Sequence, residues 1–309
     1  MRPIRGLSVL LGVGILLGAG TDAEAQSNRV FVSARSGSDA NACNNINTPC
    51  QTFQGAVNQV AAGGSVIVLD TGGYGPVTIG KSLTIDSPPG IVAFIHPPAG
   101  NAVNVSAGAS DTVVLRGLSL NASAGHGIYV TSVGALYVES CTIVGFSLNG
   151  IIFTSPGQLF VKESSFSANG AAGILVVPGS GTASAAIDRC RFEGNGFSSQ
   201  IGALTGGDRA TVTVRDSVAS GGFRGFQAGN GAGQAAQVNV ERCVSTSNVV
   251  GLFASDGAST VLRASDSVVT NNTLYGIEAQ GAGSVLSRIN NTVEGNAAAQ
   301  AFTGMFSGR

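Results

Sequence analysis

The chain has 309 residues and a formal net charge of −1, with 11 % charged residues, 46 glycines and no tryptophan. This balance argues against a nucleic-acid-binding protein, which needs a basic face, and the sequence has no run of like charges that would suit a polyanion or an acidic membrane. Low charge combined with many glycines fits a repetitive structure with many tight turns.

The N-terminal segment 1–25 has the pattern of a secretory signal peptide. Arg2 and Arg5 precede an apolar run from Leu7 to about Leu17, and Ala23-Glu-Ala25 provides a small-x-small cleavage site before Gln26. The apolar run is too short to span a membrane comfortably, and no later apolar segment is long enough to be transmembrane. We therefore expect an exported protein, secreted or periplasmic, that is cleaved between Ala25 and Gln26.

Residues 26–64 are predicted to form an N-terminal cap. Phe31 to Asn41 has the composition of a short strand followed by a turn. Because export permits disulfide bonds, Cys43 and Cys50, which enclose a turn-rich loop, are predicted to pair. A metal site would need further cysteines or histidines nearby, and this stretch contains none.

A helix is predicted at the end of this cap. Thr52 is a suitable N-cap, and the helix is expected to run to about Ala62, where Gly63-Gly64 would stop it. Its apolar side consists of Phe53, Val57 and Val60. A helix with one apolar face would cover the open end of the structure that follows. Strands are then expected at Val66–Leu69, Val77–Ile79, Leu83–Ile85, Val92–Ile95 and Val103–Val105.

Beyond these first strands the sequence is internally repetitive. The clearest copy reads Val-Lys-Glu-Ser-Ser-Phe-Ser-Ala-Asn-Gly from Val161 to Gly170. With Ser164 as the reference, equivalent positions recur at a nearly regular spacing, at Leu118, Cys141, Ser164, Cys190, Ser217, Cys243 and Ser267. Apolar residues stand five and three positions before the reference and two positions after it, an alternation typical of strands. The phase breaks just before the reference, which predicts a bend between two short strands.

Asparagine recurs five positions after the reference, at Asn169, Asn195, Asn248 and Asn272. Asparagine suits a tight corner because it tolerates left-handed backbone and bonds its own turn. Stacked at the strand spacing of about 4.8 Å, asparagine amides can also bond to one another. A glycine followed by an apolar residue comes soon afterwards and predicts a third strand. These glycines are Gly127, Gly150, Gly173, Gly225, Gly251 and Gly276.

The repeat indicates a solenoid, in which each turn buries its apolar face against its neighbours. The pattern resembles the right-handed parallel β-helix proteins of the pectin-lyase-like superfamily, over about ten coils from Ser65 to Asn296. The resemblance implies an all-β fold with three strands per coil, an inward asparagine ladder and stacked apolar rows. Leucine-rich repeats, propellers and calcium-binding nonapeptide repeats fit less well. The expected organisation is a signal peptide (1–25), a cap (26–64) and a β-helix domain (65–309).

The cysteines of the repeats occupy one column of the predicted solenoid. Cys141, Cys190 and Cys243 alternate with Ser164 and Ser217 at the reference position. Two coil rises separate successive cysteines by about 10 Å, which exceeds the separation that a disulfide allows. We expect three buried free thiols that act as small core residues.

The charged residues next to the reference alternate in sign from coil to coil. Two positions before it stand Arg116, Glu139, Lys162, Asp188, Arg215 and Glu241, and one position before it stand Glu163, Arg189, Asp216, Arg242 and Asp266. In-register stacking of identical repeats would bring like charges together, and alternation turns this repulsion into attraction. A polysaccharide-binding strip is the other interpretation, although a strip of mixed sign has little net field.

Four residues are weak candidates for catalysis. His126 lies in a Gly-His-Gly string that resembles the motif of polygalacturonases, where the histidine works beside an aspartate trio and an Arg-x-Lys pair; this sequence has no such partners in register. Asp208, Arg209 and Arg224, near a stretched glycine-rich loop, are the nearest approach to a cluster. Pectate lyases of this fold need clustered acids for calcium and an arginine base, and here the acids are spread along the stack.

Two functions remain. The first is an exported, non-catalytic β-helix that binds carbohydrate or serves as a cell-surface structural module, with no cofactor and no metal. The alternative is a polysaccharide lyase or glycoside hydrolase acting on acidic polysaccharide. Calcium is an expected cofactor only if the protein is a lyase, and this alternative rests on fold resemblance. Polysaccharide is the expected partner, and the short stretch after the last coil leaves a C-terminal edge that a second copy could cover.

Overall fold

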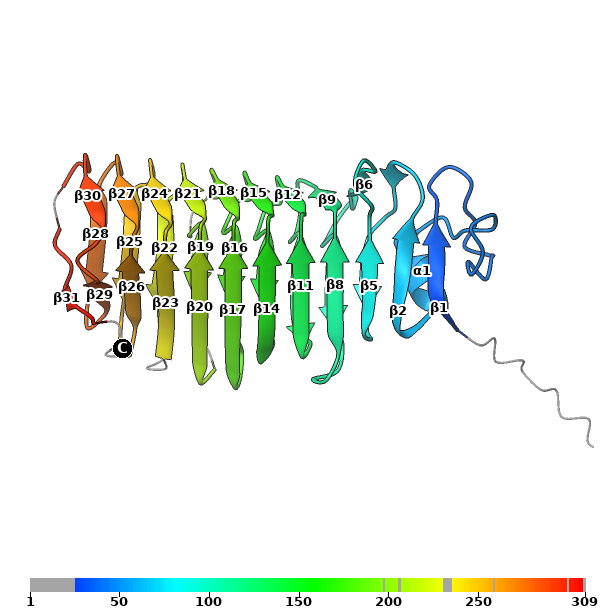
Figure 1. Ribbon diagram of the computed structural model, residues 1–309, viewed down its shortest axis with the longest axis horizontal. Coiled ribbons are helices and arrows are strands. Elements are labelled where there is room, and N and C mark those ends of the chain that lie inside the picture. Colours follow the sequence, from blue (N-terminus) through cyan, green and yellow to red (C-terminus); the bar gives the residue numbers. More distant parts are fainter. Residues whose placement is uncertain are drawn as a thin grey trace, which may run out of the picture.

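The computed structural model describes residues 26–196, 198–204, 207–229, 235–257, 259–298 and 300–307. The predicted signal peptide, residues 1–25, lies outside the described residues. In these ranges the chain winds into a right-handed parallel β-helix with three parallel sheets, called A, B and C (Figure 1). The predicted fold class is therefore confirmed.

Sheet A contains twelve strands in the described residues: β1 Ser27–Val32, β2 Val60–Val68, β5 Leu83–Asp86, β8 Thr112–Arg116, β11 Ala135–Glu139, β14 Gly157–Lys162, β17 Thr182–Asp188, β20 Arg209–Arg215, β23 Ala235–Glu241, β26 Val261–Ser265, β29 Ser284–Ser287 and β31 Gly304–Met305. Sheet B contains ten in the same ranges: β3 Gly72–Gly73, β6 Ala93–Ile95, β9 Leu118–Asn121, β12 Thr142–Val144, β15 Ser165–Ser167, β18 Arg191–Glu193, β21 Val218–Ser220, β24 Val244–Thr246, β27 Val268–Thr270 and β30 Thr292–Glu294. Sheet C contains nine across the described part: β4 Val77–Ile79, β7 Val103–Ser106, β10 Ile128–Ser132, β13 Ile151–Phe153, β16 Ile174–Val176, β19 Ile201–Ala203, β22 Arg224–Gly229, β25 Val250–Ser255 and β28 Tyr275–Gln280.

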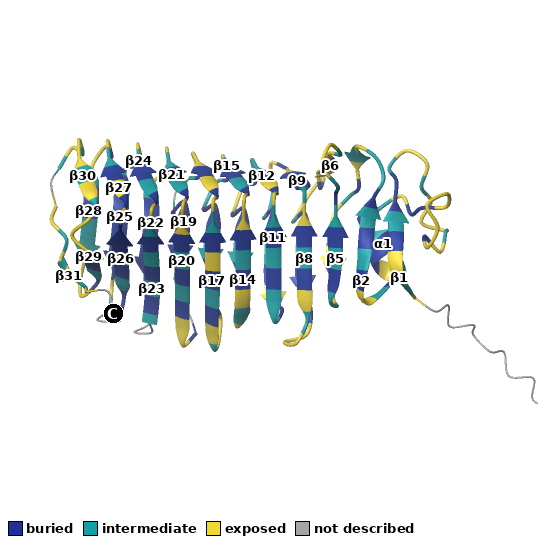
Figure 2. Ribbon diagram, in the orientation of Figure 1, coloured by how far each residue is buried: buried dark blue, intermediate teal, exposed yellow. Residues whose placement is uncertain are grey.

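Each coil runs from sheet A through sheet B to sheet C, and equivalent residues of successive coils lie side by side. Val161 of β14, for example, pairs with Val138 of β11 and Ile187 of β17. All three point inward and are at most 1 % exposed. Inward residues are buried along all three sheets, so the core is one continuous stack of apolar rows along the axis (Figure 2).

The bend between sheets A and B is made by a residue in the left-handed conformation. φ lies between 48 and 52° at the non-glycine bend residues Ser140, Glu163, Arg189, Asp216, Arg242 and Asp266. This one residue reverses the alternation, so that the next residue, such as Cys141 or Ser164, points inward again and is buried. The bend is the physical cause of the phase break in the sequence.

The reference column forms hydrogen bonds between coils. The backbone N–H groups of Cys141, Cys190 and Cys243 each donate to the hydroxyl of the serine at the same position of the next coil, over 3.0 to 3.1 Å. These serines are Ser164, Ser217 and Ser267. The three cysteines are free and buried, as predicted. Burial raises the pKa of Cys141 to about 12, so the thiol stays protonated.

The asparagine column lies at the corner between sheets B and C. The Asn169 side-chain N–H donates to Asn195 Oδ1 over 2.8 Å, and Asn248 donates in the same way to Asn272 over 3.3 Å. The coil between Asn195 and Asn248 has Gly222 at the equivalent position, which provides no side-chain amide. The buried side chain of Gln200 bridges the gap: it accepts from Asn195 and donates to the Ser220 carbonyl over 2.6 Å.

The N-terminal end is covered by α1, Phe53–Gln59 (Figure 1). Thr52 is the N-cap and accepts from the Gly55 N–H over 3.0 Å, as predicted. The predicted end at Ala62 is wrong: the backbone is already extended at Val60, which begins β2. Val60 pairs with Ser27 of β1, so the chain is already part of sheet A where the helix was expected to continue. The Cys43–Cys50 disulfide is confirmed.

The C-terminal end is covered in part by β31, which pairs with β29. A cavity of about 400 Å³ remains there, and its apolar lining includes Ile277, Val293 and Phe302. No helix in the described residues has the length and apolar character needed to cross a membrane.

Candidate functional site

The outer face of sheet C combines aromatic, aliphatic and amide side chains. Tyr129 of β10 points outward because its neighbours Ile128 and Val130 are fully buried in the core. We call the outward residues that pair with it from coil to coil the sheet C face. They are Thr78, Asn104, Tyr129, Ile152, Leu175, Gly202, Gln227, Phe253 and Glu278.

The strip from Asn104 to Leu175 is partly open to solvent. Tyr129, Ile152 and Leu175 are each half-buried and lie on adjacent strands. The Asn104 amide beside them is held in place because its Oδ1 accepts from the Asn101 side chain over 2.9 Å. Hydroxyls occupy the next outward positions along these strands, at Ser106, Thr131 and Thr154. The strip therefore offers a flat apolar surface bordered by neutral hydrogen-bonding groups.

His126 stands at the edge of this strip. Its ring stacks on Tyr129 with centroids 5.4 Å apart and 20° between the planes. Its Nδ1 accepts from the Asn149 backbone N–H over 3.2 Å, which a ring protonated at Nδ1 could not do. Burial lowers the pKa of His126. The histidine is therefore a neutral ring that supports Tyr129.

The other half of the face, around Arg224, is closed. The Arg224 guanidinium lies over the Phe253 ring, 3.9 Å from its centroid, and 4.8 Å from that of Phe223. Burial lowers the pKa of Arg224, and the charge of Glu278 opposes this. Among the described residues, Arg224 Nε and Gln227 Oε1 are buried without a hydrogen-bond partner. Phe253 is only 2 % exposed, so the aromatic surface here is occupied by the arginine.

The four weak catalytic candidates do not come together. His126 and Arg224 both lie where the chain enters sheet C, but four coils apart, which is roughly 19 Å at the spacing of parallel strands. Asp208 and Arg209 are exposed and lie where the chain leaves sheet C and begins β20. The length of a sheet C strand therefore separates them from Arg224, so the four cannot act on one bond.

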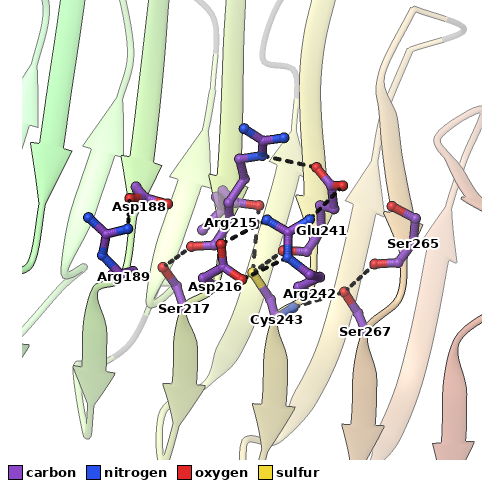
Figure 3. A network of polar contacts seen from close by, with 11 residues as sticks. Asp188, Arg189, Arg215, Asp216, Ser217, Glu241, Arg242, Cys243, Ser265 and Ser267 are labelled. Carbon is purple, nitrogen blue, oxygen red and sulfur yellow. Dashed lines mark hydrogen bonds and ion pairs between the residues drawn. The ribbon is translucent and has the colours of Figure 1, made fainter.

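The alternating charges form ion pairs along the bend between sheets A and B (Figure 3). Arg242 contacts Asp216 of the preceding coil over 2.8 Å, and Arg215 contacts Glu241 of the next coil over 3.0 Å. The hydrogen bonds to Arg242 lower the pKa of Asp216. These groups are satisfied by each other, which supports the structural interpretation of the alternation over a binding strip.

A group of three or more histidine, cysteine, aspartate or glutamate side chains that could hold a metal ion is absent from the described residues. The sequence pattern singled out His126 as a catalytic candidate, whereas the structure shows it as the ring that supports Tyr129. The signal that could have found the strip is the row of Asn104, Tyr129, Ile152 and Leu175, each one residue after the first apolar residue of its strand. Arg224 over Phe253 had no such signal, because the two lie far apart in the sequence and belong to different coils.

Comparison with known proteins identifies relatives by fold. A search of the curated proteins finds no match. A solved structure described as pectate lyase Pel9A is similar with a TM-score of 0.60 and 15 % identity, covering 89 % of this chain and 79 % of the other. A complex of XylC with xylose is similar with a TM-score of 0.60 and 8 % identity, covering 85 % of this chain and 69 % of the other. Residues 101–298 match the family model described as the right handed beta helix region, and the chain belongs to this family.

Proposed function

We propose that the protein is an exported, non-catalytic β-helix that binds carbohydrate through the strip from Asn104 to Leu175 on the sheet C face. The observation that carries the proposal is the Tyr129 ring, which is half-buried, fixed by its stack on His126 and bordered by apolar and amide side chains. A sugar ring presents an apolar C–H face and a rim of hydroxyls, and such a surface complements both.

Support for binding without catalysis comes from the chemistry of the strip. Hydrolysis of a glycosidic bond uses a pair of carboxyl groups that flank it, and proton abstraction needs a positioned base with charge stabilisation. The outward positions of β7, β10, β13 and β16 carry amide, hydroxyl, apolar and phenol groups. The similar structures add a carbohydrate context, since one is described as a pectate lyase and the other as a complex with xylose.

A lyase or hydrolase is the second candidate, and one observation favours it. Arg224 is half-buried and has a lowered pKa, which the charge of Glu278 opposes, and shifted titratable groups of this kind gather at functional sites. Such an enzyme would use the Arg224 end of the face rather than the Tyr129 strip. An activity measurement separates the two candidates.

The experiment uses residues 26–309 and two probes, xylohexaose and polygalacturonate. Calorimetry measures binding, while new reducing ends and unsaturated products are counted with and without calcium. We expect binding of at least one probe without product. Tyr129→Ala is expected to weaken it by about threefold to tenfold, because one aromatic contact contributes roughly 0.5–1.5 kcal/mol. Tyr275→Ala, which alters the half-buried tyrosine of the last sheet C strand, is the matched control and should bind normally.

Each result decides between the candidates. Product formation that Arg224→Lys abolishes would replace the binding role with the enzymatic one. Equal binding by Tyr129→Ala and Tyr275→Ala would contradict the assignment to this strip. Export is tested separately by mass spectrometry of the protein recovered outside the cytoplasm, whose N-terminus should be Gln26.

A further inference from the structure

A second feature that suits a ring-shaped ligand lies on the outer face of sheet A. Tyr137 of β11 and Phe160 of β14 point outward on adjacent strands, and their rings stack with centroids 4.6 Å apart and 13° between the planes. The next strand, β17, places Ala186 in register with Phe160. The stack therefore ends abruptly, because a methyl group stands where a third ring would continue it.

The end of the stack borders a hollow. The Phe160 ring stacks on Tyr137, and both residues line a pocket of about 230 Å³ that extends to Ala186 of the next strand. This volume is below the range of about 300–1,000 Å³ typical of drug-sized ligands, so the hollow suits a single ring. We call this pocket, with Tyr137, Glu139, Phe160, Lys162, Ala186 and Asp188 around it, the Phe160 slot.

The rim of the slot carries two carboxylates and one ammonium group. Glu139, Lys162 and Asp188 stand side by side on adjacent strands, two residues beyond the aromatic row. The two carboxylates already have cationic partners: Glu139 Oε2 lies 2.8 Å from Arg116, and Asp188 Oδ2 lies 3.2 Å from Arg189. Each uses one oxygen for this contact, so the second can accept a hydrogen bond from a ligand. The Lys162 ammonium lies 3.8 Å from a carboxylate oxygen of Glu163, beyond ordinary hydrogen-bond length, and can still donate.

We infer that the Phe160 slot binds one neutral sugar ring of a glycan chain, at a site separate from the sheet C face. The C–H face of the ring would lie on Phe160, and its hydroxyls would accept from Lys162 and donate to Asp188. A uronate ring fits less well, because Glu139 and Asp188 flank the single lysine and would repel its carboxylate. An aromatic side chain of a protein would fill the hollow but would leave the donors and acceptors of the rim unpaired.

Filling the slot gives a direct test. Ala186→Phe adds a ring at an exposed outward position, where it extends the stack of Tyr137 and Phe160 and occupies the hollow. Asn239→Phe is the matched control, since it adds the same ring to the same outward row two strands further along, beyond Thr213. Phe160→Ala removes the wall of the slot, and Phe160→Tyr retains it.

The probes are four neutral hexasaccharides, from cellulose, xylan, mannan and laminarin, and a galacturonate hexasaccharide. All variants carry Tyr129→Ala as a background, which weakens binding through the sheet C face. Failure of the proposed function can then be distinguished from failure of this inference. We expect calorimetry to detect at least one neutral probe, with binding at least tenfold weaker after Ala186→Phe or Phe160→Ala. Asn239→Phe and Phe160→Tyr should bind as the background protein does, and saturation-transfer NMR should show transfer to the C–H protons of the bound sugar.

Three results would overturn the inference. Retention of binding after Ala186→Phe would place the ligand elsewhere, and tighter binding of the galacturonate probe would contradict a neutral ring. Failure of all the neutral probes to bind would also contradict the inference. Loss of binding with Ala186→Phe alone, while Phe160→Ala still binds, would point to a disturbed fold, and circular dichroism of the Ala186→Phe and Asn239→Phe variants decides this case.

Discussion

At the scale of single residues, the polar side chains of this protein are positioned by hydrogen bonds and ring stacking between neighbouring coils. His126 accepts a backbone hydrogen bond from Asn149 of the next coil and stacks on Tyr129. Gln200 completes the asparagine column where the coil has Gly222. Both interactions join residues that are adjacent in space only because the coils are stacked in register. A residue read by itself in the sequence therefore says little about its role.

His126 leads to a prediction about pH. Burial lowers its pKa in the folded protein, so between the ordinary value of about 6.5 and the lower folded value the unfolded chain binds more protons. Stability from this group is then complete above about pH 6.5 and is lost as the pH falls below it. We expect His126→Gln to reduce the loss of thermal stability between pH 7 and pH 5.

The measurement is the melting temperature across this range for the wild type, His126→Gln and the control His96→Gln, which changes an exposed histidine. An identical pH dependence for His126→Gln and the wild type would show that protonation of His126 is not linked to folding. The same variant also reports on Tyr129, because loss of the stacked ring should alter the binding of any ligand of the strip.

At the scale of the elements, the bend between sheets A and B is the feature that shapes the coil. It uses one left-handed residue, and most of the coils place a side chain there rather than glycine. Left-handed backbone costs roughly 1–2 kcal/mol for a residue with a Cβ. Some of these bend residues form the ion pairs of Figure 3, but exposed pairs contribute about 0–1 kcal/mol. The bends therefore remain under mild backbone strain.

Ser140 allows this strain to be tested without disturbing an ion pair. Its φ is 52° and it is exposed. We expect Ser140→Gly to raise the free energy of unfolding by about 1 kcal/mol, because glycine adopts this conformation without a steric cost. Urea unfolding is the measurement, and Ser119→Gly, in the strand β9, is the control that should lower stability. A loss of stability with Ser140→Gly would contradict the strain.

At the scale of the whole molecule, the solenoid is a linear stack with two unlike ends. Helix α1 covers the first coil, and the disulfide of Cys43 and Cys50 holds the loop that precedes this helix. At the other end a cavity lined by Ile277, Val293 and Phe302 remains. Self-association through this end stays a prediction. Because each coil contacts only its neighbours, damage at one end is expected to remain local.

The disulfide provides the test of this locality. Its two cysteines are separated by 7 in the sequence, and closing so short a loop is expected to contribute roughly 2–3 kcal/mol through the entropy of the unfolded chain. We expect the double substitution of Cys43 and Cys50 by serine to speed hydrogen exchange in β1, β2 and α1, while β14 to β23 exchange as before. Uniformly faster exchange along the chain would mean that the stack unfolds as one unit, contrary to the prediction.

Sequence alone determined the architecture of this protein, because a solenoid repeats the same local pattern in every coil. The apolar alternation predicted the strands, the phase break predicted the bend now seen at residues such as Glu163, and two cysteines around a turn-rich loop predicted the disulfide. The end of α1 was wrong, at Ala62 instead of Gln59, since pairing with β1 outweighs the local preference of residues 60–62 for helix.

Only the tertiary structure decided which outward side chains meet. The pairing of Tyr129 with His126, of Arg224 with Phe253 and of Tyr137 with Phe160 depends on the register between coils and on side-chain direction. The coils differ in length, so a corner residue cannot be aligned from spacing alone. The physical reason is that burial requires an apolar residue at each inward position, which leaves a periodic signal in the sequence. Outward positions have no such requirement, so their residues differ from coil to coil and determine what the surface can bind.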